Sequence, residues 1–155
     1  MEPDIKLVVP EVNAHVLTMD ESLNQYQPGA VAVSREKIIA VGEEAVIKRN
    51  FAASQEIDCR GLILMPGLIN AHTHVPMTLM RALADDLRLD VWLQGYVWPV
   101  EREFVSPDFV QLGTKLACAE LIRSGVTCFA DMYFFEEYVA RATAQAGMRA
   151  VCSQT

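Results

Sequence analysis

Short apolar and β-branched runs alternate with polar turns through the first 65 residues, a pattern that predicts a small β-rich unit. Strands are expected at residues 5–9, 14–18, 56–59 and 62–65, and a hairpin is expected at residues 30–34 and 38–41. Arg35, Glu36 and Lys37 join the two halves of the hairpin. A short helix over about residues 43–51 follows it.

From residue 66 onward, predicted strands and helices alternate. Strands are expected at residues 67–71, 126–130 and 149–153, and helices at residues 77–84, 90–104 and 136–146. The first two helices are separated by the polar Asp85 and Asp86, and the second is expected to be interrupted at Pro99. Repeated strand–helix units predict a parallel sheet and an α/β fold.

The clearest helix opens at Ser106, a suitable N-cap, with Pro107 in the first helical position and Gly125 just past its end. Its apolar residues recur at spacings of three and four and give one apolar stripe: Phe109, Leu112, Leu116, Ala119 and Ile122. A (β/α)8 barrel needs roughly 250 residues. Residues 66–155 hold two βα units and part of a third, so we expect an N-terminal piece of a longer protein.

Charge narrows the possible partners. The chain has 13 Lys and Arg against 20 Asp and Glu, a formal net charge of −7. This charge disfavours binding to nucleic acid and to anionic membranes. The 20 uncharged residues between Arg60 and Arg81 are long enough to span a bilayer, but Pro66 and Pro76 break a continuous helix. No signal peptide is visible, so we expect a cytoplasmic protein.

Four cysteines, Cys59, Cys118, Cys128 and Cys152, form no CxxC pair. They are expected to be reduced thiols rather than a zinc cluster.

The strongest chemical motif is a pair of histidines at the end of an apolar strand. Side chains alternate along a strand, so His72 and His74 are expected to point to the same side. Two imidazoles there suit one divalent metal, although two polar residues in a loop are the alternative. His15, in the early β-unit, is expected to lie at the surface or near a turn.

The segment MPGLINAHTH, residues 65–74, resembles the first metal-binding strand of the amidohydrolase superfamily. The branch of 5-methylthioadenosine/S-adenosylhomocysteine deaminases is the most similar. That further likeness is carried by PMTLMR (76–81), ADDL (84–87), WL (92–93), WPVER (98–102) and DMYF (131–134).

The resemblance implies a TIM-type (β/α)8 barrel, begun by residues 66–155, after a small β-sandwich segment, residues 1–65. It implies that His72 and His74 bind one divalent metal ion, zinc or alternatively iron, and that Glu101 contacts the ribose hydroxyls. The remaining ligands and the proton-shuttle Glu are expected beyond residue 155. A charged helix residue paired with a nearby Arg is the alternative for Glu101.

The implied activity is hydrolytic deamination of a purine nucleoside by metal-bound hydroxide, in a homo-oligomer when full length. An s-triazine chlorohydrolase or aminohydrolase and a guanine deaminase-like enzyme are the alternatives within the class. A non-catalytic amidohydrolase-like assembly module is the alternative outside it. The 155-residue piece alone is expected to be inactive.

Two weaker expectations concern residues near the strand ends. Asp131 is expected just after a strand, where it either orients a ligand or loop or caps the next helix. Several large side chains either line a purine pocket or pack in the core: Trp92, Trp98, Met132, Tyr133, Phe134 and Phe135.

Overall fold

A computed structural model describes residues 8–9, 14–52 and 55–154. The chain divides into two compact units, Met1–Pro66 and Gly67–Thr155. Within the described part, no helix has the length and apolar character needed to span a bilayer.

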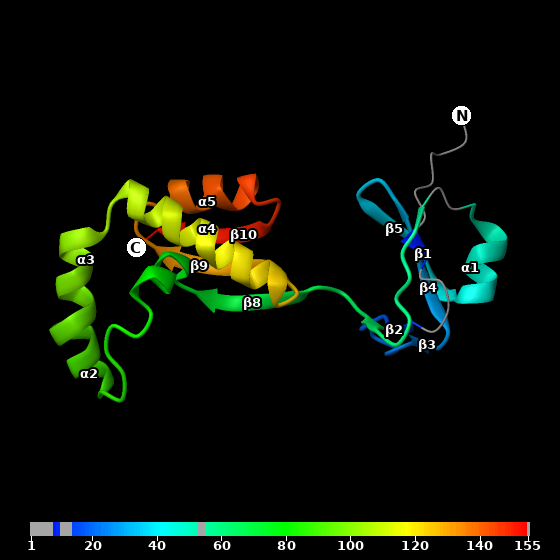
Figure 1. The fold of residues 1–155 in the computed structure, drawn as a ribbon, viewed down its shortest axis with the longest axis horizontal. Coiled ribbons are helices and arrows are strands. Elements are labelled where there is room, and N and C mark those ends of the chain that lie inside the picture. The colour runs from blue at the N-terminus through cyan, green and yellow to red at the C-terminus, as the bar shows by residue number, and fades with distance from the viewer. Residues whose placement is uncertain (1–7, 10–13, 53–54, 155) are drawn as a thin grey trace. The chain divides into compact units, whose positions relative to one another are not determined.

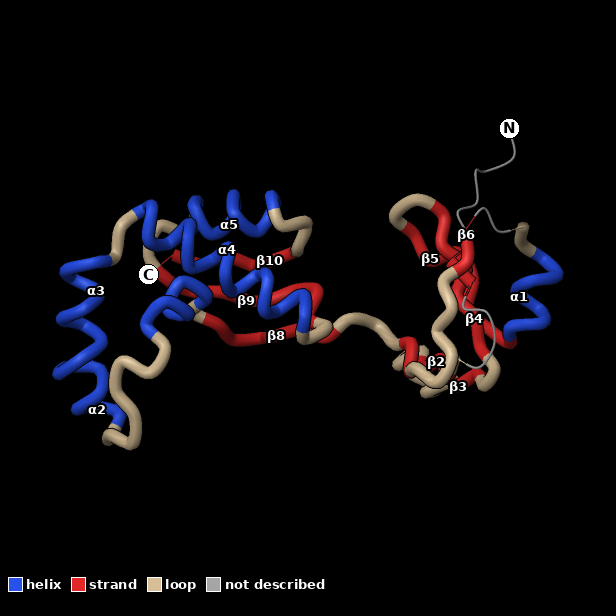
Figure 2. Tube along the Cα trace, viewed as in Figure 1, coloured by secondary structure: helices blue, strands red, loops and turns tan. Residues whose placement is uncertain are grey.

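In its described residues the N-terminal unit is built from short strands and a short helix (Figures 1 and 2). Its elements are β1 (Val8–Val9), β2 (His15–Leu17), β3 (Gln25–Tyr26), β4 (Gly29–Ser34), β5 (Lys37–Glu43), α1 (Glu44–Asn50), β6 (Gln55–Glu56) and β7 (Ile63–Leu64). β4 and β5 form the predicted antiparallel hairpin, and Lys37 belongs to a strand rather than to the turn. Most of the strand predicted at residues 5–9 lies outside the described residues.

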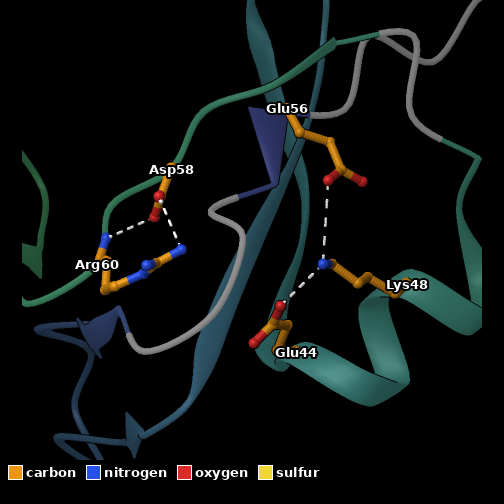
Figure 3. Close-up of polar contacts among 5 residues, drawn as sticks. All are labelled: Glu44, Lys48, Glu56, Asp58 and Arg60. Carbon is orange, nitrogen blue, oxygen red and sulfur yellow. Dashed lines mark hydrogen bonds and ion pairs between the residues drawn. The ribbon is translucent and has the colours of Figure 1, made fainter.

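The core of this unit is small, and charged contacts link its helix to a strand. Ala30, Ala32 and Ile47 are its buried cluster. Lys48 of α1 forms ion pairs with Glu44, at 2.9 Å, and with Glu56 of β6, at 3.9 Å (Figure 3).

The C-terminal unit is a three-stranded parallel sheet with helices packed against it. Its elements are β8 (Leu68–Thr73), η1 (a 3-10 helix, Val75–Met80), α2 (Leu89–Trp92), η2 (a π-helical turn, Leu93–Val97), α3 (Trp98–Phe104), α4 (Pro107–Arg123), β9 (Val126–Tyr133), α5 (Glu136–Gln145) and β10 (Arg149–Gln154). β9 lies between β8 and β10 and pairs with both in parallel. The prediction of a parallel sheet is confirmed, and α4 and α5 lie side by side against it (Figure 1).

Two predicted helices differ from the structure. Residues 77–84 do not form an α-helix. The segment begins earlier as η1, with Pro76 in its first turn and the Met77 amide donating to the His74 carbonyl three residues back. Residues 89–104 are helical without a break at Pro99. The π-helical turn η2 immediately precedes α3, and its wider backbone accommodates the proline ring.

The N-cap of α4 is confirmed, but the apolar stripe is not the buried face of the helix. The Ser106 side chain accepts a hydrogen bond from the Phe109 amide at 3.2 Å. Leu112 is 60% exposed, and the buried face is instead made of Val110, Gly113, Thr114, Ala117 and Cys118. These mostly small residues let η1 approach closely: a Cβ added at Gly113 would lie 2.6 Å from the Pro76 carbonyl oxygen.

The main core of the C-terminal unit gathers residues of η1, α4, β9 and α5 around Phe129, which is 1% exposed. All four cysteines are free thiols, and Cys118 is buried in this core.

Candidate metal and substrate site

His72 and His74 lie at the carboxyl end of β8. His72 is exposed within the strand, and His74, which follows its last residue, is half-buried. Their ring centroids are 5.0 Å apart and the ring planes are almost perpendicular, at 81°. The structure therefore brings the two imidazoles together, as strand alternation predicts.

A hydrogen bond selects the tautomer of His74. Its Nδ1 lies 2.6 Å from the backbone carbonyl oxygen of Met132. A carbonyl oxygen only accepts, so Nδ1 donates and Nε2 carries the lone pair that can bind a metal. Within the described residues no group of three or more His, Cys, Asp or Glu side chains is placed to bind a metal ion. The two imidazoles fit two of the ligands of a divalent ion, and the described residues place no third side chain of these types beside them.

An open cavity of about 290 Å³ extends from His74 to Glu101. Its walls are mostly apolar and aromatic: Met77, Trp92, Leu93, Val97, Trp98, Met132, Tyr133 and Phe134. A second cavity of about 550 Å³ is lined by Trp98, Glu101 and Phe134 as well, together with Phe135. The aromatic residues singled out in the sequence thus line cavities, with Tyr133 also part of the buried core.

Glu101 belongs to α3, is half-buried, and accepts a hydrogen bond at 2.8 Å from the Tyr133 hydroxyl group. Tyr133 is only 4% exposed. Its burial, followed by the hydrogen bond and charge of Glu101, raises the pKa of Tyr133 well above its usual range, so its hydroxyl stays protonated and remains a donor. Among the described residues, this tyrosine rather than an arginine is the partner of Glu101.

Asp131 lies within β9, which continues to Tyr133, and not after the strand as predicted. It does not cap α5 either, because Phe135 occupies that N-cap with a left-handed φ of 54°. Instead, its buried Oδ1 accepts hydrogen bonds from the Thr73 hydroxyl, at 2.6 Å, and from the Val75 amide, at 2.7 Å. Asp131 therefore contacts the residues on both sides of His74.

Several residues of this region carried no usable signal in the sequence. The roles of Thr73 and the Tyr133 hydroxyl depend on partners 58 and 32 positions away in the chain. Glu136 resembles an ordinary acidic residue of a first helical turn, yet it is only 5% exposed.

His15 lies in the N-terminal unit, where its Nε2 is 3.0 Å from the Gln25 side-chain oxygen.

A model of the amidohydrolase family matches residues 63–155, more than half of the chain, and the chain belongs to that family.

Known proteins match nearly the whole chain. It is 50% identical over 143 residues to the 5-methylthioadenosine/S-adenosylhomocysteine deaminase of Syntrophobacter fumaroxidans, a match that covers 92% of this chain and 32% of that protein. The zinc-bound adenosine deaminase of Xanthomonas campestris is 42% identical to this chain and superposes on it with a TM-score of 0.82. The match covers 91% of this chain and 34% of that protein's chain.

The atrazine chlorohydrolase of Arthrobacter aurescens TC1, solved with zinc, is 25% identical to this chain, with a TM-score of 0.80. The match covers 96% of this chain and 35% of that protein's chain. The chain thus spans about a third of the length of the relatives it matches.

Proposed function

We propose that the full-length protein is a metal-dependent hydrolase that deaminates a purine nucleoside of the 5-methylthioadenosine or S-adenosylhomocysteine type. The observation that carries this proposal is that His74 and Glu101 line one and the same cavity. A proposed metal ligand and a proposed acceptor for sugar hydroxyls therefore line the same cavity, between aromatic walls. In the reaction, water adds to the purine carbon that bears the amino group, and ammonia leaves.

His72 and His74 are the proposed ligands for zinc, with iron as the alternative metal. The zinc-bound relatives support this choice. A bound zinc ion acts as a Lewis acid and lowers the pKa of water. His74 contributes a fixed ring, because its Nδ1–H bond to Met132 holds both its orientation and its tautomer.

Glu101 is proposed to bind the ribose. A carboxylate accepts two hydrogen bonds from a vicinal diol, and these are charge-assisted. The Tyr133 hydroxyl holds Oε1 of Glu101 while lone pairs of the carboxylate remain for the sugar. Trp92, Trp98 and Phe134 provide apolar surface for the purine ring.

We also propose that residues 66–155 are the first βα units of a TIM-type barrel and that residues 1–65 are a β-sandwich segment. The parallel order β8–β9–β10 supports the barrel. So does the exposure of apolar side chains on the outer strands, such as Ile69 at 72% and Val151 at 67%.

Hydrolytic removal of chlorine or an amine from an s-triazine ring is the second candidate, supported by the likeness to atrazine chlorohydrolase. The two candidates differ at Glu101, because a triazine has no ribose to contact it. The same difference applies to a free base such as guanine.

The test measures ammonia released by the zinc-loaded full-length protein from methylthioadenosine, from guanine and from an amino-substituted s-triazine. Chloride release from a chlorinated s-triazine is measured alongside. We expect ammonia from the nucleoside, abolished by His74→Ala. Turnover of the ribose-free compounds alone would favour the alternatives, and no turnover by the zinc-loaded protein would contradict the proposal.

A further inference from the structure

Two buried carboxyl groups lie near residues 73–75, the segment between β8 and η1 that contains His74 and is called the histidine-bearing turn below. Asp131 of β9 is 3% exposed and Glu136, the first residue of α5, is 5% exposed. Oδ2 of Asp131 and both carboxyl oxygens of Glu136 are buried and accept no well-formed hydrogen bond from a described residue. Leaving three buried oxygens without a well-formed hydrogen bond is costly, and the contacts of Glu136 with the Cys152 side chain and the Tyr133 backbone do not complete one.

A single proton between the two carboxyl groups satisfies two of these three oxygens. Two adjacent buried carboxylates cannot both remain ionised, and among the described residues neither forms an ion pair. Burial, followed by the hydrogen bond and the charge of Asp131, raises the pKa of Glu136 to about 7. The other titratable groups facing the pair, Cys152 of β10 and Tyr133 of β9, are also shifted toward their neutral forms.

Protonated Glu136 can donate to Oδ2 of Asp131, which leaves Asp131 ionised. Its Oδ1 then accepts charge-assisted hydrogen bonds from the Thr73 hydroxyl and the Val75 amide. The Thr73 hydroxyl also lies 2.7 Å from the Ala130 carbonyl oxygen. Together with the bond from His74 to Met132, these contacts attach residues 73–75 to residues 130–132 of β9.

We propose that Asp131 and Glu136 share one proton and that Asp131, held in this way, is the positioning residue for the turn that presents His72 and His74 to a metal. The metal itself rests on the proposed function, whereas the shared proton does not. Neither carboxyl group is needed as a ligand in this account. Their contribution is the fixed backbone on both sides of His74.

The shared proton is tested first, in metal-depleted full-length protein. Infrared spectra below the raised pKa of Glu136 are expected to contain the carbonyl band of a buried protonated carboxylic acid. Glu136→Gln should remove the band, because an amide replaces the acid. Glu137→Gln is the matched control, since Glu137 is the exposed neighbour in the same helical turn and should leave the band in place. A wild-type spectrum without the band overturns the proposal.

Positioning is tested by zinc affinity, measured by competition with a chromophoric chelator. Asp131→Ala should bind zinc about 10-fold to 100-fold more weakly, the usual effect of losing a group that orients a ligand. Glu136→Leu should also weaken binding. Glu136→Gln should restore wild-type affinity, because its amide donates to Asp131 as the protonated acid does. Equal affinity in wild type and Glu136→Leu overturns the proposal, as does failure of Glu136→Gln to rescue.

Thr73→Val provides a second variant if Asp131→Ala does not fold. It removes one hydrogen bond to Asp131 and leaves the acid pair intact, so zinc binding should weaken while the infrared band remains. Unchanged affinity in Thr73→Val would count against positioning. If wild type itself binds no zinc, the proposed function fails, and the infrared result still decides whether the proton is shared.

Discussion

The two units of this chain contain carboxyl groups in contrasting environments. In the N-terminal unit, Asp20 is exposed and hydrogen bonds from Asn24 lower its pKa. Glu44 pairs with Lys48. In the C-terminal unit, burial raises the pKa of Glu136, and Asp131 accepts hydrogen bonds from the histidine-bearing turn.

These carboxyl groups of the N-terminal unit bind residues close to them in the sequence, whereas those of the C-terminal unit bind residues in distant segments. Asp20 and Asn24 are four positions apart, as are Glu44 and Lys48. Asp131 and Thr73 are 58 positions apart, and Tyr133 and Glu101 are 32 apart. In the C-terminal unit, buried polar groups lie where parallel strands end, which is where active sites form in α/β folds.

The largest effect is expected from replacing the histidines of the C-terminal unit. In the full-length protein, His72→Ala or His74→Ala should remove most bound zinc and nearly all deaminase activity, because each deletes a proposed ligand. His15→Ala, in the N-terminal unit, is the control and should retain full zinc content. Elemental analysis of the purified variants checks this, and full zinc occupancy in both His72→Ala and His74→Ala would remove the assignment.

A smaller effect is expected at Glu101. Losing a charge-assisted hydrogen bond costs about 1.5–3 kcal/mol, so Glu101→Ala should lower kcat/KM for methylthioadenosine roughly 10-fold to 100-fold. A ribose-free heterocycle that the wild type turns over should be affected much less. Glu103→Ala, an exposed residue of the same helix, is the control. Equal losses with both substrates would mean that Glu101 is structural.

The opposite pKa shifts predict opposite pH effects on stability. Glu136 titrates near 7 in the folded chain and near 4.5 when unfolded, so the folded state holds the extra proton between these values. Its contribution is fully present below about pH 4.5 and is lost as pH rises through about 7, a change of roughly 1–3 kcal/mol.

Urea unfolding of the metal-depleted full-length protein over this range measures the effect. The unfolding free energy of wild type should match that of Glu136→Gln most closely at low pH and should fall below it as pH rises, whereas the difference between wild type and Glu137→Gln should stay constant. A pH-independent difference for Glu136→Gln would contradict the raised pKa. Asp20, whose pKa is lowered, contributes in the opposite direction, with stability lost as pH falls through its folded pKa.

The smallest expected effect concerns packing beneath the site. Gly113→Ala should destabilise the protein by about 1–2 kcal/mol, because the clash with Pro76 outweighs the gain in helix propensity. Gly95→Ala is the control. Its added Cβ would meet no atom within 4 Å, so it should be neutral or slightly stabilising. Thermal unfolding of the two variants checks the difference, and equal Tm values would show that η1 is not closely packed on α4.

Local signals in the sequence predicted much of the fold. Alternation along β8 placed His72 and His74 on one side, and Ser106 was correctly read as the cap of α4. The apolar stripe on α4 is not its buried face, because periodicity selects the large residues, while the close approach of η1 buries small ones such as Gly113 and Ala117. The tight pairing of Asp131 with Thr73 and Val75 depends on strand register, which no local pattern encodes.

Anomalous diffraction at the zinc edge tests most directly whether the histidines at the end of β8 bind a metal. Crystals of the zinc-loaded full-length protein should contain an anomalous peak about 2.0–2.1 Å from Nε2 of both His72 and His74, while Nδ1 of His74 keeps its bond to the Met132 carbonyl. A zinc ion located away from these two rings, or bound through Nδ1 of His74, would contradict the account.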